Sequence, residues 1–200
     1  MAGFMANPEL VWEWYNYRRS VLSQTKPNAA HRALANWGLS CPSLTLITQN
    51  VDGLHQAAGQ RDVLELHGNI RVNRCLKCSL ESGDDLTKFT GIPICPCGGE
   101  YRPGVVWFGE MLPETTLRQA FSAAESCDLF LVIGTSAVVY PAASLPEIAA
   151  ECGASTIEVN TESTQFSAQA SCSVIAPATL AVPALLHSWQ RTHTMSQQNS

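Results

Sequence analysis

Four short apolar runs along the chain each end abruptly in polar residues. The runs cover residues 44–47, 63–66, 129–133 and 156–159, and their length and β-branched content predict buried strands. The polar residues that follow are Gln49, Asn50 and Asp52 after the first run, His67 after the second, Gly134, Thr135 and Ser136 after the third, and Asn160 after the fourth. The carboxyl ends of parallel strands line one crevice of an open sheet, and ligands bind there. We therefore expect these polar groups to form one site.

Aromatic-rich or amphipathic segments between these runs predict helices. Asn7-Pro8-Glu9 has the composition of a helix start, and a second helix is expected to begin at Asn28 and end at Gly38, so that residues 7–38 form a helical segment. Further helices are expected over residues 53–60, 114–125, 141–153 and 177–189, followed by a disordered tail over residues 191–200. Strands that alternate with helices in this way predict an α/β fold with a parallel sheet.

Composition narrows the classes of function. Apolar residues make up 46% of the chain and charged residues 14%, which is typical of a compact globular protein. The net charge is −5 and no basic run is longer than Arg18-Arg19, so a nucleic-acid-binding surface is not expected. No apolar run approaches the length of a membrane span, and the start lacks a charged signal region. The expectation is a soluble intracellular protein.

The eight cysteines fall into two groups. Cys41, Cys127, Cys152 and Cys172 are scattered beside apolar residues and are interpreted as small buried hydrophobic residues. Cys75, Cys78, Cys95 and Cys97 form C-x2-C, a gap of sixteen residues, and C-x-C, which is typical of a four-thiolate zinc site in an intracellular chain. A disulfide pair or free thiols are the alternatives. Because four thiolates fill the tetrahedral shell, the zinc is expected to be structural.

Two segments leave alternatives open. Tyr15 and Arg18 are spaced to share one helix face, and the spacing alone favours an amphipathic helix with a solvated arginine over a pair directed at an acid. Residues 104–110 place apolar side chains beside glycine, which suits an exposed edge that pairs with an extended peptide. Taken alone, the same segment is an ordinary core strand.

The residue chemistry indicates a nucleotide-handling enzyme. Gly134-Thr135-Ser136 and Asn160 are groups that could hydrogen-bond the phosphates or ribose hydroxyls of a nucleotide. His67 at a strand end could act as a general base near neutral pH. Neither a nucleophilic serine motif nor an open metal site accompanies them.

As an ordered set, these motifs resemble those of the sirtuins, which are NAD-dependent protein-lysine deacylases. The motifs are residues 48–59, Leu66-His67-Gly68, the four paired cysteines, residues 105–110, Gly134-Thr135-Ser136 and Asn160, and the resemblance runs from about residue 7 to 188. It implies one catalytic domain over residues 1–200. In that domain residues 44–67 and 105–190 would form a Rossmann-like parallel sheet with its helices, and residues 69–104 would form an inserted zinc module.

The resemblance also implies a role for each group. Gln49, Asn50 and Asp52 would line the nicotinamide and ribose pocket, and His67 would deprotonate a ribose hydroxyl. Gly134, Thr135, Ser136 and Asn160 would hold the adenosine half of NAD, and one structural Zn²⁺ would bind the four paired cysteines. Val106, Trp107, Phe108 and Gly109 on one side, with Val139 and Tyr140 on the other, would hold an acylated-lysine peptide as a strand.

A subgroup of sirtuins carries a Tyr-x-x-Arg pair and prefers succinyl, malonyl or glutaryl groups. Tyr15 and Arg18 match this pair in type and spacing. A guanidinium can bind a terminal carboxylate bidentately, and a phenol adds a further donor. The resemblance therefore favours a desuccinylase with some deacetylase activity over the solvated helix face.

The family pattern normally starts with a buried strand that runs into a Gly-Ala-Gly loop, followed by an Arg-bearing segment that covers the NAD phosphates. This chain starts at Met1-Ala2-Gly3-Phe4, and the Gly-rich loop is expected to be missing. Two alternatives to an active deacylase follow: a peptide reader that binds acyl-lysine without consuming NAD, and a zinc-stabilised structural fragment. The expected location is the cytoplasm in a bacterium, or the mitochondrion or cytosol in a eukaryote.

Overall fold

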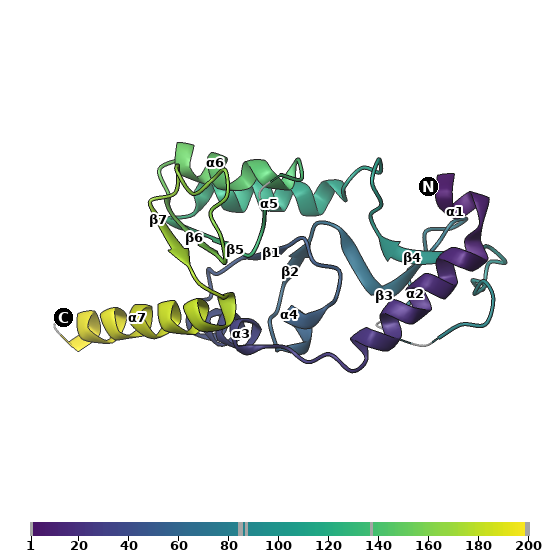
Figure 1. The fold of residues 1–200 in the computed structure, drawn as a ribbon, viewed down its shortest axis with the longest axis horizontal. Helices are drawn as coiled ribbons and strands as arrows, with labels where there is room; N and C mark the ends of the chain where they lie inside the picture. Colours follow the sequence, from purple (N-terminus) through teal and green to yellow (C-terminus); the bar gives the residue numbers. More distant parts are fainter. Residues whose placement is uncertain (1, 84–85, 87, 137, 199–200) are drawn as a thin grey trace. The chain divides into compact units, whose positions relative to one another are not determined.

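The computed structural model describes residues 2–83, 86, 88–136 and 138–198, and these residues form two compact units (Figure 1). Unit 1 consists of Met1–Lys26, Ile47–Leu54 and Glu65–Thr116. Unit 2 consists of Pro27–Leu46, His55–Leu64 and Leu117–Ser200. Each unit is described by itself below.

Unit 1 packs a long helix against a twisted pair of strands. After the short α1 (Ala2–Ala6), α2 (Pro8–Leu22) begins where the sequence predicts, because the Asn7 side chain accepts a hydrogen bond from Leu10 N at 3.1 Å. The antiparallel strands are β3 (Gly68–Cys75) and β4 (Tyr101–Val105), and α2 lies along them (Figure 1). The buried core of the unit contains Phe4, Trp12, Tyr15, Leu22, Leu54, Ile70 and Val105.

A fully buried arginine joins α2 to β3. Arg19 Nε donates to the carbonyl oxygen of Ile70 at 2.9 Å, and its Nη2 donates to Asn73 Oδ1 at 2.6 Å. The guanidinium also stacks over the ring of Trp12 at 5.3 Å. Burial of a charge is tolerated only with such partners, so these contacts fix how α2 faces the strands.

Unit 2 is built around a parallel sheet. Its strands are β5 (Leu129–Ile133), β6 (Ser155–Asn160) and β7 (Cys172–Ile175), in the order β5-β6-β7. The helical elements are α3 (Ala29–Ser40), α5 (Glu114–Ser126, which begins in unit 1), η1 (Ala142–Ser144), α6 (Leu145–Glu151) and α7 (Ala178–Gln198). α3 and α7 lie side by side (Figure 1) and bury Leu34, Trp37, Val182 and Leu186 together.

The first two predicted strands pair with each other. β1 (Leu46–Thr48) and β2 (Val63–Glu65) form a two-stranded sheet with α4 (Leu54–Ala57) between them in sequence. The pairing continues one residue further, since Leu66 N donates to the carbonyl oxygen of Thr48 at 3.0 Å. The α/β class and the parallel sheet are confirmed, while β7 is an additional strand that the sequence pattern did not predict. Its four residues are too few to show a period.

Three sequence-based expectations are wrong. α3 continues through Gly38 to Ser40, and a Cβ at Gly38 would meet the side chain of Gln60 at 3.0 Å. α7 runs as far as Gln198 and so covers most of the segment predicted to be disordered, residues 191–200, since no glycine or proline follows Pro183 within the helix. Among the four scattered cysteines, none is buried: Cys41 and Cys127 are half-buried, and Cys152 and Cys172 are exposed at element ends.

Within the described part of the chain, no helix combines the length and apolar character that crossing a membrane requires.

Candidate active site

His67 is held at the end of the β1–β2 pair by its ring and its backbone. Its Nδ1 lies 3.0 Å from the carbonyl oxygen of Gln49, and its own carbonyl oxygen accepts a hydrogen bond from Val106 N at 2.8 Å. Because a carbonyl oxygen can only accept, Nδ1 carries the proton in this contact. In the neutral ring the lone pair then lies on Nε2, which is the nitrogen able to take a proton from a hydroxyl.

Gly68 permits the close approach of β3 and β4 directly after His67. Its φ is +73°, and a Cβ at this position would meet the carbonyl oxygen of Gly104 at 2.1 Å. A residue with a side chain would therefore force the strands apart. The position of the His67 backbone depends on this glycine.

The predicted nicotinamide-pocket residues lie in the loop between β1 and α4. Gln49 contributes its carbonyl oxygen to His67, and the backbone N–H of Asn50 donates to Thr48 Oγ1 at 3.1 Å. Asp52 Oδ1 accepts from Leu54 N at 2.9 Å and so caps α4. These contacts shape the loop; the contacts of its side chains with nicotinamide or ribose stay a prediction.

A hollow of about 290 Å³ in unit 1 brings Arg18 and Asp52 together. Val51, Leu22 and Ile70 contribute apolar wall to it. Arg18 is exposed, and its guanidinium carbon lies 4.9 Å from the ring centroid of Trp14. A long cationic side chain held over an aromatic ring beside a partly apolar hollow is suited to binding a short chain that ends in a carboxylate.

Tyr15 does not line this hollow. It is buried, and its hydroxyl oxygen accepts a hydrogen bond from Trp107 Nε1 at 2.8 Å. Burial raises the pKa of Tyr15, and the hydrogen bond from Trp107 and the charge of Arg18 oppose that rise. The phenol is therefore neutral at physiological pH and keeps its proton for donation.

The segment after β4 turns instead of continuing as a strand. The edge that we predicted through residue 110 ends at Val105, because Glu110 N donates back to the carbonyl oxygen of Trp107 at 3.0 Å. The Glu110 carboxylate accepts from Trp107 N at 3.0 Å and forms an ion pair with Arg102 at 2.6 Å. Trp107 is thus fixed, whereas the side chain of Phe108 is 96% exposed.

The peptide-binding residues predicted from the sequence lie in both units. Val106, Trp107, Phe108 and Gly109 belong to unit 1, whereas Val139 and the exposed Tyr140 belong to unit 2. Their pairing across a bound peptide stays a prediction.

Unit 2 gathers the four residues predicted to hold adenosine. Gly134, Thr135, Ser136 and Asn160 line one pocket of about 580 Å³. Asn160 Nδ2 donates to the carbonyl oxygen of Thr135 at 2.9 Å, and Gly134 N donates to the carbonyl oxygen of Val159 at 2.9 Å. These bonds join the ends of β5 and β6, where a parallel sheet binds its ligands.

Four further residues of the pocket lining were missed by the sequence reasoning. They are Glu162, Ser163, Thr164 and Gln165, in the segment after β6. The polar run after Asn160 could have indicated these residues. It contains no periodic apolar positions, however, so the sequence does not predict which side of the sheet it packs against. None of the eight lining residues is basic, so the pocket suits neutral hydroxyls better than phosphate.

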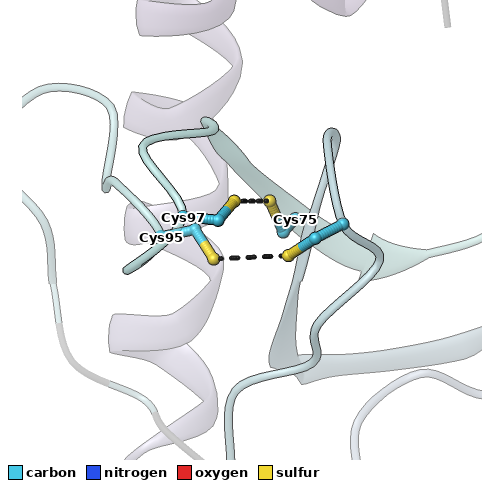
Figure 2. A group of neighbouring side chains, drawn as sticks. Cys75, Cys95 and Cys97 are labelled. Carbon is cyan, nitrogen blue, oxygen red and sulfur yellow. Dashed lines mark hydrogen bonds between the residues drawn. The ribbon is translucent and has the colours of Figure 1, made fainter.

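The four paired cysteines converge as the spacing predicts. Their sulfur atoms all lie within 4.8 Å of one another, with Cys75 to Cys97 at 3.6 Å and Cys78 to Cys95 at 3.7 Å (Figure 2). A tetrahedral Zn²⁺ with bonds of about 2.3 Å to sulfur separates its ligands by about 3.8 Å. The cluster therefore fits one zinc ion, and the four sulfurs leave no open position for catalysis. All four thiols are free of disulfides.

Comparisons with known proteins agree with this arrangement. Residues 1–141 match the sequence profile of the Sir2 family. The chain belongs to the Sir2 family. It is 50% identical over 163 residues to the NAD-dependent protein deacylase of Aquifex aeolicus, a match that covers 80% of this chain and 68% of the relative. The NAD-dependent protein deacylase 1 of Pseudomonas aeruginosa is 45% identical over 194 residues, which is 92% of this chain and 78% of the relative.

Solved structures of Sir2 proteins have the same fold. A Sir2 homologue in complex with NAD has a TM-score of 0.90 and 41% identity, covering 94% of this chain and 75% of that one. A Sir2 protein bound to an acetylated peptide has a TM-score of 0.83 and 33% identity, covering 94% of this chain and 81% of that one. The predicted resemblance to the sirtuins is thereby confirmed.

Proposed function

We propose that this Sir2-family chain is an NAD-dependent protein-lysine deacylase that prefers acyl groups ending in a carboxylate. NAD is a co-substrate: the bond to nicotinamide and the bond between the acyl carbon and the lysine nitrogen are broken, one water is consumed, and the products are nicotinamide, O-acyl-ADP-ribose and the free lysine. The names of its relatives support the activity, and the residues around His67 and Arg18 support the roles that follow.

The hydrogen bond between His67 Nδ1 and the Gln49 carbonyl oxygen carries the proposal. It orients the ring and gives Nε2 the lone pair, so that His67 acts as the general base towards a ribose hydroxyl. Gln49, Asn50 and Asp52 orient the nicotinamide and its ribose beside that base. The adenosine half of NAD occupies the pocket of unit 2, where Thr135, Ser136 and Asn160 offer hydrogen-bonding groups.

Arg18 sets the preference for an acidic acyl group. Its guanidinium pairs with the terminal carboxylate of a succinyl, malonyl or glutaryl chain, whose methylene groups contact the apolar wall at Val51 and Ile70. Tyr15, which the resemblance pairs with Arg18, lies outside this hollow and is bonded to Trp107, so Arg18 alone contacts the carboxylate here. The peptide backbone runs along residues 106–109 and 139–140, and the whole chain from residue 1 to 200 acts as one catalytic domain.

Product analysis tests the activity. The unchanged chain, given NAD and a succinyl-lysine peptide, is expected to release O-succinyl-ADP-ribose detectable by mass spectrometry. His67→Ala is expected to lower the rate by about 10²- to 10⁴-fold, the range for loss of a general base. ADP-ribose affinity should survive in this variant. Binding of the acyl peptide without any product would make the chain an acyl-lysine reader instead.

Two variants that each remove one arginine charge test the acyl preference. Arg18→Met is expected to lower kcat/KM for a succinyl-lysine peptide by about 10- to 100-fold, since a charge-assisted hydrogen bond is lost, and to leave the acetyl-lysine peptide nearly unaffected. The matched control is Arg61→Met, which removes another exposed arginine from unit 2. Equal losses on the two substrates would refute the preference while leaving the deacylase assignment intact.

A further inference from the structure

Glu158 is a fully buried carboxylate bonded to a residue that lines the pocket of unit 2, Thr164. It lies on β6 two residues before Asn160, so both side chains project from the same face of the strand. Asn160 lines the pocket, whereas Glu158 does not. A buried carboxylate is costly unless it is well hydrogen-bonded, so its partners indicate what it does.

Three hydroxyl groups converge on this carboxylate. Thr164 Oγ1 donates to Oε1, Ser167 Oγ donates to Oε2, and Ser173 Oγ donates to Oε2 at 3.0 Å. Burial by itself would raise the pKa of Glu158, but these hydrogen bonds outweigh it and hold the pKa below its ordinary value. The group is therefore an anion at neutral pH, and each hydroxyl must point its proton at it.

Two of these hydroxyls also organise the backbone of the segment between β6 and β7. With its proton committed to Glu158, Ser167 Oγ accepts from Thr164 N at 2.7 Å, and Thr164 Oγ1 accepts from Phe166 N at 3.1 Å. The backbone N–H groups can only donate, so what the carboxylate fixes is the orientation of each hydroxyl: its proton points at Glu158 and its lone pairs are left to accept from the backbone. Thr164 is itself part of the pocket wall.

We infer that Glu158 is a positioning residue for the cofactor pocket. Its carboxylate fixes the fold of residues 161–167, of which residues 162–165 line the pocket together with Gly134-Thr135-Ser136, and so acts on NAD through Thr164 and its neighbours without touching the ligand. The inference rests on the proposed use of this pocket for the adenosine half of NAD.

Hydrogen exchange and ADP-ribose binding test the inference together. In Glu158→Gln the amide group puts an N–H donor where a hydroxyl proton now points, so amide protection over residues 161–167 should fall. ADP-ribose affinity, measured by calorimetry, should weaken by about 10- to 100-fold, because hydrogen bonds to a charged group are lost. Ser167→Ala removes one donor, leaves the carboxylate in place, and should give a smaller change in the same direction.

Thr156→Val is the matched structural control. Thr156 is buried on the same face of β6, two residues further from the pocket, and its hydroxyl accepts from Ser171 N at 3.0 Å. This variant should lose stability but keep the affinity for ADP-ribose. The role of Glu158 would be overturned by an equal loss of ADP-ribose affinity in Thr156→Val and Glu158→Gln, or by unchanged amide protection over residues 161–167 in Glu158→Gln. Either result would leave the assignment of the pocket intact. Failure of the unchanged chain to bind ADP-ribose would overturn the assignment of the pocket and the inference with it.

Discussion

The two units stabilise their parts of the site with different chemistry. In unit 1 the stabilising groups are charged or metal-binding. Arg102 donates two hydrogen bonds to Glu110 at 2.6 and 2.9 Å, and four thiols converge on one site. In unit 2 the buried carboxylate of Glu158 is held by neutral hydroxyls. The difference means that metal removal should act on unit 1, whereas local hydroxyl changes should act on unit 2. If the proposed roles hold, proton transfer at His67 and cofactor recognition in unit 2 can be disturbed one at a time.

Loss of zinc should have the largest effect and should be confined to unit 1. Cys75→Ser or a strong chelator is expected to remove one zinc ion per chain and most amide protection over residues 68–105, because binding of a structural zinc contributes directly to folding. The sheet β5-β6-β7 should keep its protection. Cys172→Ser, which changes an exposed cysteine, is the control. Metal analysis measures the zinc content and hydrogen exchange measures the amide protection of each unit. An equal loss of protection in both units would refute the claim that zinc stabilises unit 1 alone.

Glycine substitutions should have a smaller effect than zinc loss, and the one in unit 1 should cost more stability than the one in unit 2. Gly68→Ala is expected to destabilise the protein by about 3 kcal/mol or more, since backbone oxygen occupies the place of the new methyl group. Gly153→Ala also has a positive φ, of +94°, but its Cβ would meet nothing within 4 Å. It should cost only about 1 kcal/mol of conformational strain. Urea unfolding measures both, and similar costs would mean that β3 and β4 can separate without penalty.

Acidification should give the smallest effect. Hydrogen bonds from Arg102 hold the pKa of Glu110 below its ordinary value, although partial burial opposes this. A carboxyl group with a lower pKa in the folded state contributes stability above its unfolded pKa, and the contribution is lost as the pH falls through the folded pKa. Glu110→Gln should remove about 1 kcal/mol at pH 7 and flatten the acid dependence of unfolding. An unchanged pH profile in this variant would exclude the ion pair as its source.

Local sequence signals predicted the parts of the site that depend on spacing. Four cysteines at fixed intervals, the asparagine cap at Asn28 and the polar residue at each strand end needed no knowledge of distant contacts. The side-chain cap of α3 at Asn28 is present, with Ala30 N donating to its Oδ1 at 2.9 Å.

Features that depend on distant partners could not be predicted from the chain alone. Arg18 and Arg19 are adjacent and chemically identical, yet one is exposed and the other buried, because only Arg19 faces the carbonyl oxygen of Ile70. The wall formed by residues 162–165 depends in the same way on Glu158, a carboxylate whose surroundings no local pattern reveals. Alternating polar residues at Thr156, Glu158 and Asn160 were the only hint that one face of β6 carries chemistry.

The buried Arg19 also sets the rotational register of α2. A helix turns by about 100° per residue, so deleting one residue between Trp12 and Arg19 would swing either the indole or the guanidinium out of its place. A shifted helix would lose one of these two contacts, so the outward direction of Arg18 depends on them. Variation of the proposed acyl-binding surface on this helix should therefore proceed by exchange of side chains, because insertions and deletions would displace Arg19.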